Sequence, residues 1–318
     1  MKLLITGGFG YLGGRLAQFL ASQAGYEILL GSRQHAAPPR WLPQAKVAQT
    51  QWDSQAGLEE ICTGADAVVH LAGMNAQDCA ADPVAALELN AVATARLLQA
   101  AVQQGVRRFI YLSTVHVYGS PLAGVITEET CPVSLHPFAA SHRAGEDVLR
   151  AAHQRGEIEG VVIRQSNGYG APAHKDANCW MLLLNDLCRQ AVTTQRMVLR
   201  SPGQRRDFVT LTDACRAIRH LLELPTVKLG DGLFNVGGGW SPTISEMTQH
   251  VAARIHAVTG NSPEILRKED QNTESAELLD YRMKKLIGTG FNVSGNGNVD
   301  QEIDRLIRFC LEHVTQSS

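Results

Sequence analysis

The sequence has 318 residues, of which 44% are hydrophobic and 19% are charged, and its formal net charge is −2. This length supports a sizeable core in one large domain or two closely packed ones, and the composition is ordinary for a soluble globular enzyme. The near-zero charge offers no basis for binding nucleic acid or an anionic membrane surface.

The N-terminal run of apolar residues ends at Gly7 after only six positions. It is too short for a signal peptide or a membrane span, so we expect a buried strand and a cytoplasmic protein. Seven cysteines without a C-x-x-C spacing argue against a disulfide framework or a zinc site. Eleven histidines form no H-x-x-x-H or H-E-x-x-H pair, and we expect no structural metal.

Strand-like and helix-like segments alternate through the N-terminal half. Strands are expected at residues 1–6, 26–31, 65–72, 106–113 and 161–164, and helices at residues 12–22, 82–104 and 141–155. This rhythm, with nearly continuous apolar strands, predicts a parallel sheet covered by helices on both faces. Right-handed crossovers then give an α/β fold with a doubly wound parallel sheet.

The regular alternation of strand-like and helix-like segments ends after Gly170. Helices are expected at residues 179–190, 244–259 and 299–313, a strand at 233–236 and a loop at 288–297. Residues 206–209 begin a segment that we expect to return to the sheet. The chain therefore divides into a first domain, residues 1–168 plus about 205–237, and a smaller C-terminal α/β domain, residues 169–204 plus 238–318.

A glycine-rich turn joins the first strand to the first helix. Glycines at 7, 10 and 13 allow a tight turn, a close approach of backbone N–H groups to a pyrophosphate, and packing of the helix on the strand. An ordinary strand-turn-helix with spare glycines is the alternative. We expect the first domain to be a dinucleotide-binding (Rossmann) domain and the second to bind substrate. The expected cofactor-binding residues here are Gly7, Phe9, Gly10, Tyr11, Leu12 and Gly13.

The second strand ends in Gly31-Ser32-Arg33, without the acid that usually binds the ribose of NAD. A guanidinium suits a 2′-phosphate, so we expect NADP, with NAD less favoured. Arg33 as a solvated loop residue is the alternative. Asp53 and Ser54, after the third strand, could contact the adenine.

Further motifs follow the later strands in a specific order. They are His70-Leu71-Ala72-Gly73, Asn90, the segment 111–119, the segment 164–170, the segment 203–209 and Phe234-Asn235-Val236-Gly237. Together with the glycine turn, they resemble the extended short-chain dehydrogenase/reductase family of nucleotide-sugar epimerases, dehydratases and reductases. The resemblance covers nearly the whole chain and implies that Leu71, Ala72, Gly73 and Asn90 line the cofactor site. The Gly-Ser-Arg end of the second strand is similar to that of the NADP-dependent sugar reductases.

The resemblance implies a Ser/Thr, Tyr and Lys triad, which is incomplete here. Thr114 matches the first position, but Phe138 stands at the Tyr position and His142 at the Lys position. Ser141 and Glu146 keep the usual pattern, so these are substitutions in register. The string Tyr281 to Lys285 has the same spacing but lies far downstream in a polar, helix-like segment, and we interpret it as chance.

Histidines are the candidate replacements for the missing acid–base pair. The Asp-Glu pair of the family's 4,6-dehydratases is Val115-His116 here, so a dehydratase reaction is not expected. His116 could transfer a proton, because a neutral imidazole titrates near the working pH, although a buried, hydrogen-bonded strand-end histidine is the alternative. His142 could donate to the nicotinamide ribose, and a satisfied histidine on a helix surface is equally compatible.

Three interpretations stay open. The chain is an NADP-dependent reductase or epimerase that uses Thr114, His116, His142 or a water; it is a catalytically silent NADP-binding sensor or partner protein; or its chemistry needs no proton at that place. On the substrate side, the resemblance gives Asn167 and Arg206 contacts to a sugar or nucleotide-sugar substrate, with an Arg206–Asp207 salt bridge as the structural alternative. It also implies a homodimer, formed through the helices at 82–104 and 141–155.

Overall fold

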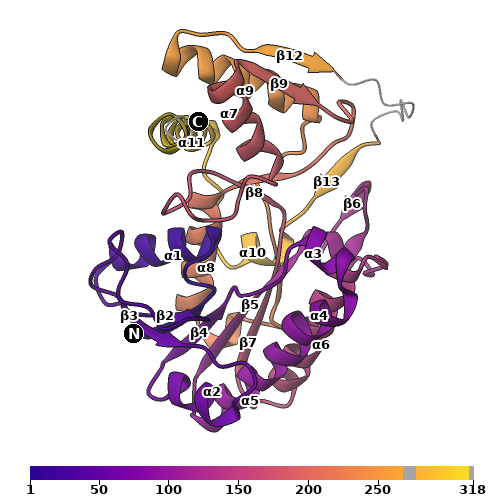
Figure 1. Ribbon diagram of the computed structural model, residues 1–318. Helices are drawn as coiled ribbons and strands as arrows, with labels where there is room; N and C mark the ends of the chain where they lie inside the picture. The colour runs from indigo at the N-terminus through magenta and orange to yellow at the C-terminus, as the bar shows by residue number, and fades with distance from the viewer. Residues whose placement is uncertain (268–276, 315–318) are drawn as a thin grey trace.

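A computed structural model describes residues 1–267 and 277–314 of the chain. Figure 1 shows a large sheet with its helices in the lower part and a smaller group of helices and short strands above it. The sheet has seven strands, all parallel, in the order β11-β7-β5-β4-β1-β2-β3. These strands are β1 (Lys2–Thr6), β2 (Glu27–Ser32), β3 (Lys46–Gln49), β4 (Ala67–His70), β5 (Arg108–Thr114), β7 (Glu159–Gln165) and β11 (Leu233–Val236).

The sheet confirms the expected doubly wound fold. The chain builds outward from β1 to β2 and β3, then crosses back so that β4 pairs with the other side of β1, with Thr6 opposite His70. In such sheets ligands bind where the strand order reverses, at the carboxyl ends of the strands. The segments that follow Thr6 and His70 therefore lie at the predicted site of a cofactor.

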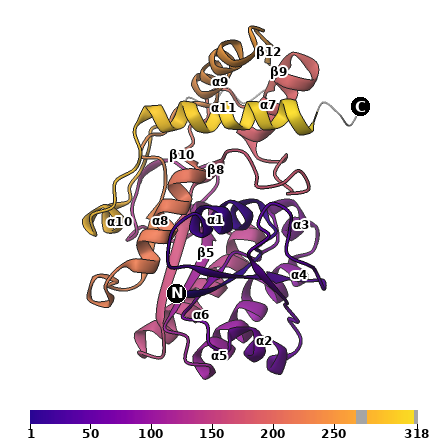
Figure 2. The same cartoon turned by 90° about the vertical axis from the view of Figure 1, so that its left-hand side faces the viewer.

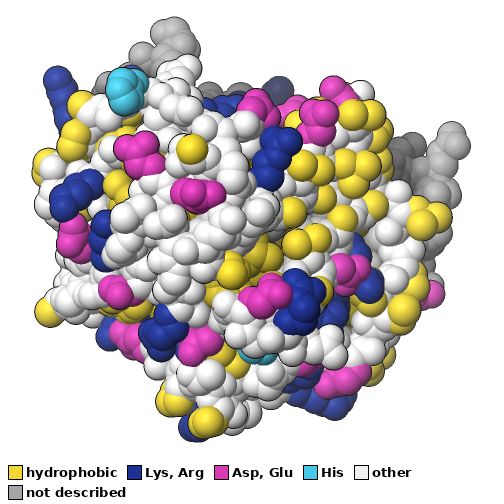
Figure 3. Space-filling model, turned by 90° about the horizontal axis from the view of Figure 1, so that it is seen from below, with side chains coloured by type: hydrophobic (Ala, Val, Ile, Leu, Met, Phe, Trp, Pro, Cys, Tyr) yellow, Lys and Arg dark blue, Asp and Glu magenta, His cyan; other side chains and the backbone are white. Residues whose placement is uncertain are grey.

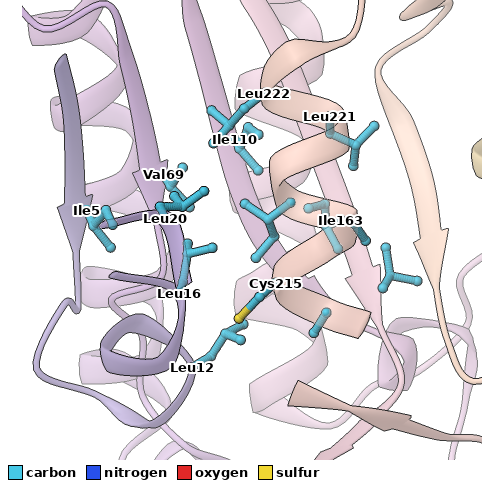
Figure 4. Packing of buried hydrophobic residues seen from close by; sticks show 14 of the residues in the cluster. Ile5, Leu12, Leu16, Leu20, Val69, Ile110, Ile163, Cys215, Leu221 and Leu222 are labelled. Carbon is cyan, nitrogen blue, oxygen red and sulfur yellow. The ribbon is translucent and has the colours of Figure 1, made fainter. Parts of the chain in front are cut away.

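Alternating strand residues supply the two faces of the sheet. Leu3 and Ile5 pack with α1 (Tyr11–Ala21) and α8 (Leu211–Glu223), as Figure 4 shows for Ile5, Leu16 and Cys215. Leu4, between them, packs on the other face, which is covered by α2 (Gln55–Cys62), α5 (Thr94–Gln103) and α6 (Pro137–Gln154). Fully burying one such aliphatic side chain contributes about 1.5–3 kcal/mol, so both layers are firmly fixed to the sheet.

The second part has its own core. It is built around α7 (Leu183–Thr194), α9 (Ile244–Thr259) and α11 (Asn296–His313). Figure 2 shows α11 lying across the molecule, between the other two helices of this part and the sheet. Two short parallel pairs accompany these helices: β8 (Asn167–Tyr169) with β10 (Phe208–Thr210), and β9 (Arg196–Leu199) with β12 (Glu264–Arg267).

The segment that begins at Arg206 returns to the main sheet, as expected, but only at β11. Its first strand, β10, pairs with β8 in a separate sheet. The reason lies in Phe208, whose ring packs on Tyr169 in the core of the second part. The return is made instead by α8 and β11. The proposed division at about 205–237 therefore stays a prediction.

The long helix expected at 82–104 is one helical rod with an irregular turn. It comprises α4 (Pro83–Leu87), a π-helical turn at Glu88–Ala93, and α5, and the carboxylate of Asp82 caps its start by accepting from the N–H of Ala85 at 3.0 Å. The helix expected at 179–190 begins later, as α7. The remaining elements are α3 (Ala76–Ala81), a 3₁₀ turn at Val115–Tyr118, β6 (Gly124–Ile126), a 3₁₀ turn at Thr226–Lys228, β13 (Leu279–Tyr281) and α10 (Lys284–Gly288).

A buried ion pair joins the two parts. The guanidinium of Arg15 on α1 donates to the carboxylate of Glu302 on α11 at 2.8 Å and to the carbonyl of Ala171 at 2.6 Å. Both side chains are almost fully enclosed.

Within the described residues, no helix is long and apolar enough to cross a membrane, and no group of three or more His, Cys, Asp or Glu side chains could hold a metal ion.

Candidate active site

The glycine turn forms a cradle at the head of α1. Gly7 has φ +67°, and a Cβ there would lie 2.7 Å from the backbone nitrogen of Ala72. A Cβ on Gly13 would lie 2.1 Å from the carbonyl oxygen of Gly7. Gly10 caps α1 without any side-chain hydrogen bond, so the first N–H groups of the helix keep their affinity for an anion. The geometry fits a pyrophosphate.

Side chains within the turn face the protein. Leu12 is buried in the core, and the hydroxyl of Tyr11 donates to the carbonyl of Gly170 at 2.9 Å. The carbonyl of Phe9 lies 2.8 Å from Nε2 of His174, whose ring stacks on Trp41 at 5.4 Å. These residues can therefore contact a nucleotide only through their backbone or, for Phe9, a partly exposed ring. Sequence reasoning missed His174 and Trp41, which follow no motif.

The end of β2 presents a free cation. Arg33 is exposed, and its guanidinium has no hydrogen bond or ion pair to any residue that the structure describes. Asp53 is also exposed but pairs with Arg96 at 3.1 Å. The hydroxyl of Ser54 accepts from the N–H of Gly57 at 3.1 Å and caps α2. Ser54 thus has a structural role that the sequence did not reveal.

The loop after β4 joins the cofactor cradle to α6. Leu71 and Ala72 pack against Gly7, and Gly73 faces Asn90 and His142. The amide of Asn90 accepts from the N–H of Met74 at 2.9 Å and donates to the hydroxyl of Ser141 at 3.0 Å. Asn90 therefore fixes the start of α6 relative to the loop.

The candidate catalytic side chains converge around Phe138. Its partly buried ring lies 4.7 Å from the ring of His142 and 6.3 Å from that of His116. Thr114 ends β5, and its hydroxyl accepts from the N–H of His116 at 3.2 Å, which leaves the hydroxyl proton free to be donated elsewhere. The structure thus places His116 and His142 on either side of Phe138, with the Thr114 hydroxyl on the backbone of His116.

Both histidines of this cluster are neutral near pH 7. Burial lowers the pKa of His142 to about 4. Burial, followed by the positive charges of Arg206 and of His136, lowers the pKa of His116 to about 4 as well. A neutral imidazole was expected, but one with this pKa is a weaker base than a histidine that titrates near 7. His142 is also not on a helix surface, since only 7% of it is exposed.

The substrate side carries an unpaired cation. The guanidinium of Arg206 donates only to the side-chain oxygen of Gln204, at 2.9 and 3.1 Å, and no described carboxylate lies in salt-bridge range. The expected alternative, a salt bridge to Asp207, does not form. Asp207 instead accepts from the N–H of Gly238 at 2.8 Å, and its burial raises its pKa to about 6. Asn167 donates its side-chain N–H to the carbonyl of Asp207 at 2.9 Å.

A buried ion pair lies beneath the catalytic cluster. The guanidinium of Arg164 donates to the carboxylate of Glu146 at 2.5 to 3.1 Å, and both side chains are at most 2% exposed. The hydroxyl of Ser113 donates to the same carboxylate. Glu146 thus ties α6 to β5 and β7. Of the downstream string, the hydroxyl of Tyr281 donates to the backbone carbonyl of Arg164 at 2.6 Å, and Lys285 donates to Asp231 at 2.8 Å.

The parallel sheet, the glycine cradle and the cluster at its carboxyl edge define a nucleotide-dependent enzyme of the short-chain dehydrogenase/reductase class. The model of the NAD dependent epimerase/dehydratase family matches residues 3–237. The chain belongs to this family. Membership confirms the resemblance to the nucleotide-sugar-modifying members and the expected enzyme class, an oxidoreductase or epimerase.

Known proteins resemble the chain over most of its length. A dTDP-glucose 4,6-dehydratase from Streptomyces niveus is 27% identical over 264 residues, which cover 79% of this chain and 76% of that protein. MoeE5, solved with UDP-glucuronic acid and NAD, has a TM-score of 0.77 at 22% identity and covers 97% of this chain and 98% of its own. RMD from Pseudomonas aeruginosa, solved with NADPH, has a TM-score of 0.77 at 21% identity, with 98% and 99% covered. At these identities the two structures show a shared fold.

Proposed function

We propose that the protein is an NADP-dependent reductase or epimerase that acts on a sugar or nucleotide sugar, with Thr114, His116 and His142 in place of the usual Tyr and Lys. The observation that carries the proposal is that the rings of His116 and His142 both lie near Phe138, while the Thr114 hydroxyl contacts the backbone of His116. They lie at the carboxyl edge of the sheet, where a ligand of such a fold binds.

The residues of the cradle fit a dinucleotide. The N–H groups at the start of α1 would hold the pyrophosphate, and Leu71 to Gly73, with Asn90, would flank the nicotinamide side. Arg33 would pair with a 2′-phosphate, which is why we propose NADP over NAD. Asp53 and the backbone of Ser54 would lie near the adenine. When bound, the cofactor supplies or takes up the hydride.

The chemistry of the reacting oxygen rests on the chain's own groups. The free hydroxyl proton of Thr114 can be donated to a substrate oxygen. Phe138 can transfer no proton, and a missing general acid or base typically costs 10²–10⁴ in rate. His116 and His142, both neutral, can accept one. Arg206 and Asn167 would hold the anionic and polar parts of the substrate.

The bound molecules of the structural neighbours support the choice of substrate. MoeE5 was solved with UDP-glucuronic acid, and the dehydratase relative is named for dTDP-glucose. Both ligands carry a diphosphate, which suits the unpaired guanidinium of Arg206.

Turnover tests the proposal directly. The protein is incubated with NADP(H) and a panel of nucleotide sugars and keto sugars, and the reduced-nicotinamide absorbance and the product mass are followed. We expect His116→Ala or His142→Ala to lower kcat by about a hundredfold or more. The control is His256→Ala, an exposed histidine on α9. Unchanged rates in both site variants would contradict the relocated acid–base role.

A second candidate function is favoured by Phe138 itself. A chain that keeps the residues expected to bind NADP and substrate, but lacks the tyrosine hydroxyl at position 138, could act as a silent NADP-binding sensor or partner protein. The double variant Phe138→Tyr, His142→Lys separates the two. If the wild type binds NADP tightly but is inert on every substrate, and the double variant gains turnover, the sensor function holds and the enzyme proposal fails.

We also propose a homodimer that buries the exposed faces of α4, the π turn and α6. Hydrophobic side chains gather on the side of the molecule where α4 and α6 lie (Figure 3). Val84, Leu87 and Val92 are 67%, 48% and 45% exposed, which supports the proposal, because exposed hydrophobic patches are typical of association sites. Light scattering at micromolar concentration should give twice the monomer mass, and Leu87→Asp should restore the monomer.

Free thiols at all seven cysteines fit a reducing compartment, and we propose the cytoplasm.

A further inference from the structure

His142 is one end of a buried chain of hydrogen bonds. Its Nδ1 lies 2.9 Å from the hydroxyl of Tyr111, and that hydroxyl lies 3.0 Å from the backbone carbonyl of Asn90. Tyr111 and Asn90 are 1% and 0% exposed. Water therefore has little access to these contacts, and each one must be satisfied within the protein.

The number of protons available to the Tyr111 hydroxyl decides which group donates in each of its two contacts. A carbonyl oxygen only accepts, so the contact between Tyr111 and Asn90 is a hydrogen bond only if the Tyr111 hydroxyl donates to it. That hydroxyl has one proton. It cannot also donate to His142, so Nδ1 of His142 must carry the proton in their contact. The reverse assignment would place two lone pairs face to face at 3.0 Å in a buried site.

Two features of the backbone make this contact possible. Asn90 lies in the π-helical turn Glu88–Ala93, an irregularity that is frequent at functional sites. Gly145, in the middle of α6, leaves the space for it: a Cβ there would lie 2.7 Å from the Asn90 carbonyl oxygen and 2.8 Å from the Tyr111 hydroxyl. A glycine inside a helix is less favourable than alanine, and here the close approach of the two oxygens requires it.

The other nitrogen of the ring faces the candidate active site. A Cβ on Gly73 would lie 3.7 Å from Nε2 of His142, and the Phe138 ring is 4.7 Å from the imidazole. In the part of the chain that the structure describes, no group forms a hydrogen bond with Nε2. Since burial lowers the pKa of His142 to about 4, the ring is neutral near pH 7 and only one of its nitrogens carries a proton.

We propose that Tyr111 is a positioning residue that keeps the proton of neutral His142 on Nδ1, so that Nε2 presents a lone pair to the active site. The consequence concerns the proposed function, on which it rests: a lysine at this position donates a hydrogen bond, whereas Nε2 can only accept one. His142 is then an acceptor for a ribose or substrate hydroxyl, in place of the donor expected from the sequence.

Nitrogen NMR of the full-length protein tests this without any turnover. The protein is labelled with ¹⁵N-histidine, and a long-range ¹H–¹⁵N correlation spectrum is recorded at pH 7.5, with the signals of His142 assigned by their loss in His142→Gln. We expect Nδ1 in the protonated range of shifts and Nε2 in the unprotonated range. A wild-type spectrum with the proton on Nε2 overturns the proposal, whatever the outcome of the activity assays.

Two matched variants test the role of Tyr111. In Tyr111→Phe, Nδ1 loses its partner, and we expect the tautomer ratio to shift toward Nε2–H by about tenfold or more, as the loss of one ordinary hydrogen bond requires. The control is Tyr118→Phe, a buried tyrosine whose hydroxyl donates to Asn235 at 2.8 Å, and it should leave the spectrum of His142 unchanged. An unshifted ratio in Tyr111→Phe would refute the assigned role. If that variant does not fold, the wild-type spectrum decides alone.

Discussion

The cofactor cradle and the catalytic cluster lie at the same edge of one sheet but are specified in different ways. The cradle is made by backbone: Gly7 and Gly13 leave no room for a Cβ, and the N–H groups of α1 have no side-chain cap. The cluster is made by side chains from β5 and α6, with Phe138 and His142 in contact and Tyr111 behind them.

This difference determines what a substitution does in each region. In the cradle, any added atom collides with the backbone, so the shape itself is required. In the cluster, where the family resemblance leads us to expect Tyr and Lys, Phe138 and His142 pack together and His142 forms a hydrogen bond with Tyr111. A parallel fold can therefore change its reactive groups while the nucleotide site stays the same.

The largest expected effect lies under the cluster. Glu146→Gln would leave the guanidinium of Arg164 buried without a counter-charge, and breaking such a pair costs about 3–5 kcal/mol. Urea unfolding followed by circular dichroism measures the change. The neighbouring Asp147→Asn, which breaks only an exposed pair with Arg143, should cost less than 1 kcal/mol. Equal stabilities of the two variants would show that the ion pair does not hold the cluster together.

A lower pH should reduce the free energy of unfolding, because buried histidines near the catalytic cluster are neutral in the folded protein. Burial lowers the pKa of His70 to about 3 and that of His142 to about 4, so unfolding takes up protons below pH 6.5 and stability falls as the pH falls toward these values. From pH 7 to 5 each contributes a loss of about 2 kcal/mol. Asp207, whose pKa burial raises to about 6, offsets about 1 kcal/mol of that loss over the same range.

Unfolding in urea at the two pH values tests this sign. His70, His142 and Asp207 together should make the protein less stable at pH 5 by about 3 kcal/mol, and His116, whose pKa burial also lowers to about 4, adds to that loss. His142→Gln should reduce the difference by about 2 kcal/mol. A protein that is equally or more stable at pH 5 would contradict the neutral, buried state of these histidines.

In the cradle, Gly13→Ala should be costly because its Cβ would lie 2.1 Å from the carbonyl oxygen of Gly7. Overpacking of this kind costs about 2 kcal/mol, and NADPH fluorescence titration should show binding weakened at least tenfold. The control is Gly288→Ala, because a Cβ there meets nothing within 4 Å. Wild-type affinity in Gly13→Ala would mean that the cradle tolerates side chains as the cluster does.

The smallest effect concerns cofactor choice. Arg33→Ala should weaken NADPH binding about tenfold, or about 1.4 kcal/mol, and leave NADH binding unchanged, because a charge-assisted hydrogen bond to the 2′-phosphate is lost. Calorimetry measures both affinities. Arg40→Ala, an exposed arginine in the same loop, is the control. Equal or tighter binding of NADH by the wild type, unchanged in Arg33→Ala, would refute the preference.

The same difference explains what the sequence could predict. The parallel sheet and the glycine turn follow from apolar runs and glycine spacing, which are local signals. β10 pairs with β8 because Phe208 packs in the core of the second part. No local sequence pattern shows in which of the two cores this residue will pack. Thr114, His116 and His142 are candidates that the family resemblance suggests, but the partner of His142 is Tyr111, 31 positions away. Gly145, inside a helix, was a signal that could have pointed to it.

The ion pair between Arg15 and Glu302 has a consequence for biosynthesis. The chain leaves the ribosome from its N-terminus, and the partner of Arg15 is made 287 residues later. Until α11 emerges, the guanidinium of Arg15 lacks its carboxylate partner, so the ion pair that holds α1 against the second part cannot form. The helix whose head carries the glycine cradle should therefore be the last part of the first domain to settle. A nascent chain would then reach its full affinity for the nucleotide only after α11 has been made.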